Sequence, residues 1–219
     1  WQERALENFL INEAIKKADH NIEPTHLMFN MATGTGKTMI MAALILYYHK
    51  KGYRHFIFFV NQNNIVDKTE NNFITQTHTK YLFRNNIVID DKTVNIRKVE
   101  TFDDTDDIQI KFTSIQLLHN SVYLAAENSI TLEDLQKKDL VMIGDEAHHL
   151  NALTIRNGQT EIDIPLELKE NASEKDLEKS WEDTVLNKIL KRGLSKQRKE
   201  NKNVLLEFTA TIPKDVDVI

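Results

Sequence analysis

Met31-Ala-Thr-Gly-Thr-Gly-Lys-Thr38 is the stretch of this chain that decides its fold. It joins a short apolar run at 26–30 to a strongly apolar segment at 38–50, which predicts a buried strand, a glycine-rich loop and a buried helix. Gly34 and Gly36 allow the backbone to curl so that successive N–H groups face inward. The helix that follows adds the positive end of its dipole, so the loop is suited to bind the phosphates of a nucleotide.

Lys37 and Thr38 complete this loop. We expect Lys37 to reach the β- and γ-phosphates and the Thr38 hydroxyl to bind Mg²⁺. The first glycine of the pattern G-x-x-x-x-G-K-[ST] would fall at Met31, which is the one departure from it. A glycine-rich turn that merely opens a helix is the alternative, and the position between a strand and a helix argues against it.

A second motif, Gly144-Asp-Glu-Ala-His-His149, follows the apolar run at 140–143. We expect Asp145 to hold Mg²⁺ through water and Glu146 to polarise the attacking water, while His148 could sense the γ-phosphate. A surface acidic pair is the alternative. A zinc site at the two histidines lacks a third ligand at metal spacing, and the segment does not match H-E-x-x-H.

Thr209-Ala-Thr211 supplies hydroxyl groups after a last predicted strand at 204–208. In a parallel sheet these residues would lie near the second motif, since ligands bind beyond the carboxyl ends of the strands. We therefore expect Thr209, Ala210 and Thr211 to couple the nucleotide state to a neighbouring surface.

Apolar runs alternate with helical patterns along the chain, which predicts an α/β domain with a mostly parallel central sheet and helices on both faces. We expect residues 1–219 to form a single domain, a fragment of a longer protein, with an irregular excursion at 151–180. Besides the elements above, we expect helices at 2–18, within 61–77, at 131–136 and around 181–190, and strands at 56–60, 87–89, 94–99 and 108–112.

Composition excludes several classes of protein. The chain of 219 residues has no cysteine, which excludes disulfides and thiolate metal sites. No apolar run is long enough to cross a bilayer, so we expect a cytoplasmic protein with no membrane partner. The net charge of −5 does not favour nucleic-acid binding, although a locally basic groove would permit it.

These motifs together resemble the first RecA-like motor domain, a P-loop NTPase fold, of superfamily 2 helicases and translocases. The stretch at 31–38 resembles motif I, Asp145-Glu-Ala-His148 resembles the DEAH-type motif II, and Thr209-Ala-Thr211 resembles motif III. Gln2 resembles the glutamine that reads adenine in these proteins, the alternative being a solvated helix residue. The resemblance implies ATP and Mg²⁺ as cofactors and this nucleotide-binding set: Gln2, Thr33, Gly34, Thr35, Gly36, Lys37, Thr38, Asp145 and His148.

A narrower resemblance is to the Res subunits of type III restriction enzymes. It rests on the segments at 58–69, 145–151 and 181–186, which lie ahead of Phe208-Thr-Ala-Thr211. In that family the motor hydrolyses ATP to move or switch on double-stranded DNA, a C-terminal nuclease cuts, and a second RecA-like domain supplies arginine fingers. The resemblance therefore implies DNA, that second domain and a modification (methyltransferase) subunit as partners.

Carried over from this family, the DNA contacts would touch phosphates rather than bases. A polar loop or a helix cap is the alternative for each of them. The residues are Asn61, Gln62, Lys68, Ser114 and Gln116.

Other functions stay open. Another superfamily 2 DNA or RNA helicase would share motifs I and II, and the segments near 60–62 and 181–186 favour the restriction subunit over it. A nucleotide-gated binding module that barely hydrolyses ATP is disfavoured by the intact Glu146. A small-molecule kinase would usually need a lid and an acceptor site.

Overall fold

A computed structural model describes residues 1–19, 23–60, 63–123, 130–146, 183–191 and 202–210 of the chain. Its centre is a sheet of six described strands in the order β1-β8-β7-β2-β6-β5, all of them parallel. In chain order these are β1 (Thr25–Asn30), β2 (His55–Val60), β5 (Ile96–Lys98), β6 (Ile108–Ser114), β7 (Leu140–Asp145) and β8 (Val204–Thr209). The predicted α/β fold with a parallel sheet is confirmed.

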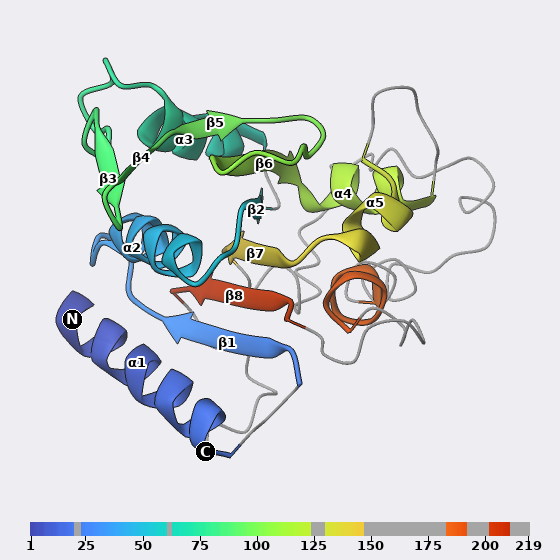
Figure 1. The fold of residues 1–219 in the computed structure, drawn as a ribbon, viewed down its shortest axis with the longest axis horizontal. Helices are drawn as coiled ribbons and strands as arrows, with labels where there is room; N and C mark the ends of the chain where they lie inside the picture. The colour runs from blue at the N-terminus through green and yellow to red at the C-terminus, as the bar shows by residue number, and fades with distance from the viewer. Residues whose placement is uncertain (20–22, 61–62, 124–129, 147–182, 192–201, 211–219) are drawn as a thin grey trace, which may run out of the picture.

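Helices cover both faces of this sheet (Figure 1). On one face, here called the α2 face, lie α1 (Gln2–Ala18), α2 (Lys37–Lys50) and α3 (Asn63–Ile74). On the opposite face, the α4 face, lie α4 (Ile115–Tyr123), α5 (Leu132–Lys137) and the π-helix η1 (Asp183–Leu190). The sheet is therefore the middle layer of three.

The apolar runs of the sequence are continuous because each central strand is buried on both faces. In β2, Phe56, Phe58 and Val60 join the core on the α2 face, while Ile57 and Phe59 join the core on the α4 face. Side chains alternate across a strand, so a run without polar positions is required wherever both faces are covered.

All six strands run in the same direction, so their carboxyl ends meet at one edge of the sheet. Asn30 of β1 lies opposite Thr209 of β8, and Phe208 lies opposite Asp145 of β7. Further along, Val60 of β2 lies opposite Ser114 of β6. The segments that follow these strands are thus brought side by side, although they are far apart in sequence.

One predicted strand, at 94–99, is wrong as a single element. The structure divides it between β4 (Lys92–Val94), which forms an antiparallel hairpin with β3 (Ile87–Ile89), and β5, which pairs with β6. Asp90 and Asp91 form the hairpin turn with positive φ angles of 49° and 63°, a conformation that aspartate tolerates better than most residues.

Two further local outcomes concern helices. Helix α4 was not expected from the sequence, because its apolar residues continue directly from the end of β6. The expected helix at 131–136 is confirmed as α5, and a capping box begins it: Thr131 Oγ1 accepts a hydrogen bond from Asp134 N at 3.2 Å, and Thr131 N donates to Asp134 Oδ2 at 3.1 Å. The expected excursion at 151–180 lies outside the described residues. No helix in the described ranges combines the length and apolarity needed to cross a bilayer.

Candidate active site

The glycine-rich loop leaves β1 at the carboxyl edge of the sheet and turns directly into α2. Gly34 and Gly36 have φ angles of +80° and +93°, in the left-handed region that residues with a Cβ rarely occupy. Gly36 is the N-cap of α2, and its carbonyl accepts hydrogen bonds from Met39 N at 2.9 Å and Ile40 N at 3.2 Å. Both glycines therefore adopt the backbone conformation that the sequence predicted for this loop.

The loop is also held together by its own polar groups. Thr35 Oγ1 donates to Ala32 O at 2.7 Å, and Lys37 Nζ donates to Met31 O at 3.3 Å. Lys37 thus lies folded across the loop, and Thr38 beside it is half-buried. An ammonium group at this place is positioned to exchange a carbonyl oxygen for a phosphate oxygen, which is a stronger acceptor.

Gln2 lies against the loop. Its Nε2 donates to Thr35 O at 3.1 Å, and a Cβ at Gly36 would come within 2.0 Å of that nitrogen. The side chain therefore packs on Gly36 and braces the turn into α2. Adenine reading by Gln2 stays a prediction.

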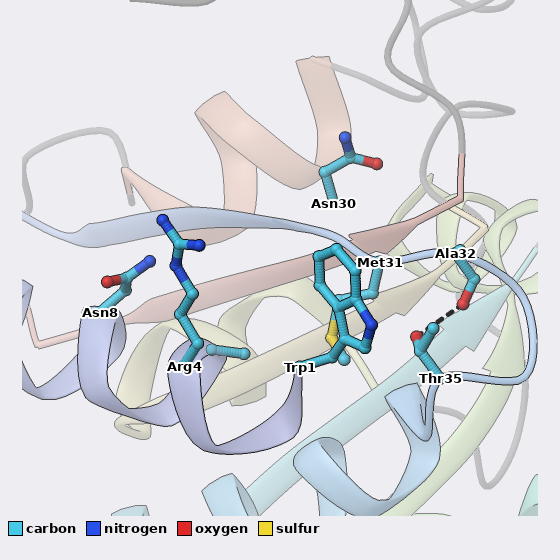
Figure 2. Close-up of a pocket in the computed structure, with 8 residues that line it drawn as sticks. Trp1, Arg4, Asn8, Asn30, Met31, Ala32 and Thr35 are labelled. Atoms are coloured by element: carbon cyan, nitrogen blue, oxygen red, sulfur yellow. Dashed lines mark hydrogen bonds between the residues drawn. The ribbon is translucent and has the colours of Figure 1, made fainter.

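Beside the loop is a pocket of about 240 Å³ between α1 and the end of β1. Figure 2 shows Arg4 and Asn8 projecting from α1 toward β1, with the indole of Trp1 beside Met31. Ala32 and Thr35 of the loop also line it. The sequence pattern did not reveal this pocket, because its walls come from a helix face and a strand end.

The acidic pair lies two strands away from the loop, at the end of β7. Asp145 is the last residue of β7, and Glu146 N donates to Asp145 Oδ1 at 3.0 Å. Glu146 has a φ angle of +55°, which is uncommon for a residue with a side chain and typical of strained functional positions.

Burial raises the pKa of Asp145, and the negative charge of Glu146 raises it further. The hydrogen bond from Glu146 N, Lys37 and Lys68 act in the opposite direction and lower the same pKa, but they do not outweigh burial. A partly buried carboxylate that lacks sufficient positive charge fits a site for a cation. Together with the Thr38 hydroxyl and water, it suits Mg²⁺, which needs few protein ligands. No group of three or more His, Asp or Glu side chains suited to a metal occurs in the described ranges.

Thr209 lies between the two motifs. It is fully buried at the end of β8, and its carbonyl accepts a hydrogen bond from Met31 N at 2.9 Å. Half-buried Ala210 follows it. Thr209 and Ala210 thus lie at the carboxyl end of the strand that separates the loop from Asp145. Thr211 and His148 lie outside the described residues.

The residues expected to contact DNA differ in burial and in position. Ser114 is buried, and its Oγ accepts a hydrogen bond from Leu117 N at 3.4 Å, so it serves as a cap of α4. Gln116 is half-buried on α4. Lys68 is exposed on α3 and acts on Asp145 through its charge, a relation that the sequence spacing did not reveal. Asn61 and Gln62 lie outside the described residues.

Comparisons with known proteins agree on one family. The family model described as type III restriction enzyme, res subunit, matches residues 1–214. The chain is 55% identical over 224 residues to the probable type III restriction-modification enzyme HindVIP Res subunit of Haemophilus influenzae. That alignment covers 100% of this chain and 43% of the relative, so the chain spans less than half of the relative's length.

Proposed function

This chain belongs to the family of type III restriction enzyme Res subunits, and from that premise we propose that it is the ATP-binding motor domain of a DNA-dependent ATPase. The chain spans 43% of the length of its relative, so the activity, substrates and partners of the whole protein are part of this proposal.

The observation that carries the proposal is the convergence of the two motifs at one edge of the sheet. The loop follows β1 and the acidic pair ends β7, with only β8 between them. Neighbouring strands lie about 4.8 Å apart, so the two motifs face each other across about 10 Å. That gap suits the end of a triphosphate with its Mg²⁺.

Each residue then has a defined role in hydrolysis. The loop at Thr33–Thr38 binds the phosphates through backbone N–H groups, and Lys37 neutralises the β- and γ-phosphates. Asp145 and the Thr38 hydroxyl would hold Mg²⁺, which would polarise the phosphoryl group. Glu146 orients the water that attacks the γ-phosphorus, giving ADP and inorganic phosphate.

The pocket beside the loop is suited to the base of the nucleotide. Trp1 offers an indole face for stacking, and Arg4 and Asn8 offer hydrogen-bond donors within the same pocket. The base would then lie next to Gln2 while the phosphates occupy the loop. We propose ATP as the nucleotide because the pocket and the phosphate loop occur together in a chain of this family.

We propose double-stranded DNA as the polymer that stimulates turnover, with phosphate contacts at Asn61, Gln62 and Gln116 near the ends of β2 and β6. The relative is named as the Res subunit of a restriction-modification enzyme, which supports a modification subunit as partner. A second RecA-like domain of the parent chain would supply arginine side chains to the γ-phosphate, so residues 1–219 alone should turn over ATP very slowly.

The test is ATP hydrolysis by the full-length parent protein without polymer and with double-stranded DNA, single-stranded DNA or RNA. Stimulation by double-stranded DNA supports the proposal. Stimulation by RNA or single strands alone would indicate another superfamily 2 helicase and leave only the nucleotide site in place. The Glu146→Gln variant controls for contaminating ATPase, since it should bind ATP without hydrolysing it.

A further inference from the structure

Helix η1, drawn in orange in Figure 1, is a π-helix of eight residues that lies between β7 and β8 in the chain. Its backbone hydrogen bonds span one residue more than those of an α-helix: Lys191 N donates to Leu186 O, five residues back, at 2.9 Å. Helices of this kind are rare in proteins and occur frequently at functional sites. The presence of η1 beside the strands of the nucleotide site therefore calls for a physical explanation.

The buried residues of η1 follow the period of the π-helix. Side chains five residues apart lie near one another in this geometry, and two such pairs are buried. These pairs are Thr184 with Ile189 and Val185 with Leu190. Leu186 is only half-buried, and Asn187 and Lys188 are exposed. The polar Thr184 thus occupies a core position, while the apolar Leu186 lies at the margin of the core.

The sequence of η1 fits an α-helix better than the π-helix that it forms. An α-helix turns by about 100° per residue, so the four apolar residues of 184–190 would form one continuous face and the three polar residues the opposite face. The apolar face would hold Val185, Leu186, Ile189 and Leu190, and the polar face Thr184, Asn187 and Lys188. A change from the π register to the α register would therefore exchange Thr184 for Leu186 in the core. Such a conflict between local pattern and structure is expected at functional sites.

Hydrogen bonds to neighbouring elements hold both ends of η1. At its first turn, a bond of 2.8 Å joins Thr184 Oγ1 to His119 Nδ1 of α4, and both side chains are buried. Burial lowers the pKa of His119, so its ring is neutral at physiological pH. At the last turn, Asn203 Nδ2 donates to Ile189 O at 2.8 Å, and Asn203 Oδ1 accepts from Leu140 N at 3.1 Å. The last turn is thus fixed to the beginning of β7 and β8, and the first turn is fixed to α4.

Helix α4 begins where one of the DNA contacts is proposed. Gln116 lies in its first turn, and His119 follows three residues later on the same side of the helix. Leu117 between them is 56% exposed, so this turn is open to solvent at the carboxyl edge of the sheet. A DNA phosphate that binds Gln116 and draws α4 toward it would move His119 as well and lengthen its bond to Thr184.

We propose that η1 is a switch with two registers that links DNA binding at α4 to the nucleotide site; this inference rests on the proposed DNA-dependent ATPase function. Without DNA, the bond between His119 and Thr184 holds the π register. Bound DNA breaks this bond, and η1 adopts the α register, in which Leu186 replaces Thr184 in the core. Leu186 gains apolar burial while the hydroxyl of Thr184 regains water, so the two registers offset each other and DNA can select between them.

The core on the α4 face carries the change to the nucleotide site. The cluster against which Leu186 packs includes Met142 of β7 and Leu205 of β8. These two strands end at Asp145 and Thr209. His119 and Thr184 are therefore positioning residues, which act on the ATP site through η1 and these strands.

The first test measures the register of η1 by thiol alkylation in the full-length parent protein. Residues 1–219 contain no cysteine, and mass spectrometry of the η1 peptide isolates the signal of each single substitution. Linear double-stranded plasmid DNA should raise the alkylation rate in Thr184→Cys by about tenfold and lower it in Leu186→Cys by about threefold. Lys188→Cys is the control, because position 188 lies on the exposed side in both registers and its rate should not change.

Only opposite changes at 184 and 186 support the switch. Rates that rise in both variants would indicate local unfolding of η1 and would overturn the proposal. Rates that DNA leaves unchanged would overturn it too. If DNA nevertheless stimulates ATP hydrolysis in the same samples, the proposed function stands and only the switch fails; if DNA does not stimulate the wild-type protein, both fail.

The second test biases the two registers in opposite directions. Thr184→Ala removes the bond that holds the π register and should lower the DNA concentration for half-maximal ATPase stimulation by about threefold. Leu186→Gln disrupts the apolar face of the α register and should raise that concentration by a similar factor. Thr184→Ser keeps the hydroxyl and should match the wild type. Shifts of the same sign in Thr184→Ala and Leu186→Gln, or no rescue by Thr184→Ser, would overturn the proposal.

Discussion

The phosphate loop and the acidic end of β7 lie at the same edge of the sheet, and they differ in how their polar groups are paired. In the loop, the strained positions are glycines, Thr35 bonds Ala32, and Lys37 bonds the carbonyl of Met31. At the end of β7, two adjacent carboxylates lie partly buried, the backbone strain falls on Glu146, and the pKa of Asp145 is raised. The polar groups of the loop are paired with one another, whereas the end of β7 holds a carboxylate whose charged form is disfavoured by burial.

This difference predicts that the loop residues control ATP binding and that the acidic pair controls ATP hydrolysis. A loop that is already folded loses little conformational freedom when phosphates bind, so its residues should govern affinity. The charged form of Asp145 is disfavoured by burial and by Glu146, and the proposed Mg²⁺ would offset this cost, so we expect the acidic pair to govern turnover and stability. Substitutions in the two halves should therefore be distinguishable.

The largest effect is expected at Glu146. Glu146→Gln keeps the shape of the side chain but removes the carboxylate that polarises water, and it should lower kcat by about 10²–10⁴-fold. ATP affinity should stay within about threefold, because the loop is untouched. Single-turnover hydrolysis by the full-length protein with double-stranded DNA measures both. Full turnover in this variant would remove Glu146 from its assigned role.

Lys37→Ala should act on affinity first. Loss of charge-assisted hydrogen bonds to two phosphates, each contributing about 1.5–3 kcal/mol, should weaken ATP binding by about 100-fold or more. Isothermal calorimetry with a non-hydrolysable ATP analogue and Mg²⁺ is the measurement. The exposed Lys80, beyond the end of α3, offers Lys80→Ala as a control that should bind normally. Unchanged affinity in Lys37→Ala would contradict the phosphate-loop assignment.

Asp145→Asn should stabilise the ligand-free protein. Because the folded pKa of Asp145 is raised, its favourable contribution is present below the ordinary pKa of aspartic acid and is lost as pH rises through the raised value. At neutral pH the ionised group is therefore a cost, and its removal should raise Tm by a few degrees, about 2–4 °C for each kcal/mol gained. The gain should shrink as pH falls toward 4, and Mg²⁺ should no longer assist ATP binding.

Asp134→Asn provides a control of opposite sign. Hydrogen bonds from Thr131 lower the pKa of Asp134, so its contribution is present above the ordinary aspartate pKa and is lost in acid. This variant should have a lower Tm than the wild type at neutral pH and approach it as pH falls. Thermal unfolding from pH 8 down to about pH 4 measures Asp145→Asn, and the series is carried below pH 3.8 for Asp134→Asn, because the contribution of a carboxylate with a lowered pKa is lost only there. A pH-independent gain in Asp145→Asn would contradict the electrostatic account.

Lys68→Gln should have the smallest effect. It tests whether α3 contributes to ATP binding or to DNA binding. Lys68 is a positive charge close enough to lower the pKa of Asp145, and it would attract a negative triphosphate bound there, so its removal should weaken ATP binding several-fold in the absence of DNA. If Lys68 instead contacts a DNA phosphate, DNA affinity would fall and its salt dependence would decrease by about one counterion. Titrations of ATP and of DNA at several salt concentrations separate the two roles.

Local patterns explain which parts of the fold were predictable. Continuous apolar runs such as 56–60 and 140–143 are typical of strands buried on both faces, and these strands and the helix at 131–136 were placed correctly. The division of 94–99 into β4 and β5 depends on two different partners, β3 and β6, which no local pattern identifies. Helix α4 was missed because its apolar residues continue those of β6 without a boundary signal.

By itself the sequence determined the chemistry available at the site. Gly34 and Gly36 set the curl of the loop, Lys37 and Thr38 follow it, and Asp145 with Glu146 follows an apolar strand; these are properties of short segments. Only the tertiary structure decided which of these segments meet. The strand order places β8 between the loop and the carboxylates and leaves β1 at the edge of the described sheet. The packing of the helices brings Gln2 against Gly36 and the charge of Lys68 close enough to lower the pKa of Asp145. Strand order and burial arise from contacts between residues distant in sequence, so the charge and strain at Asp145 and Glu146 belong to the folded chain alone.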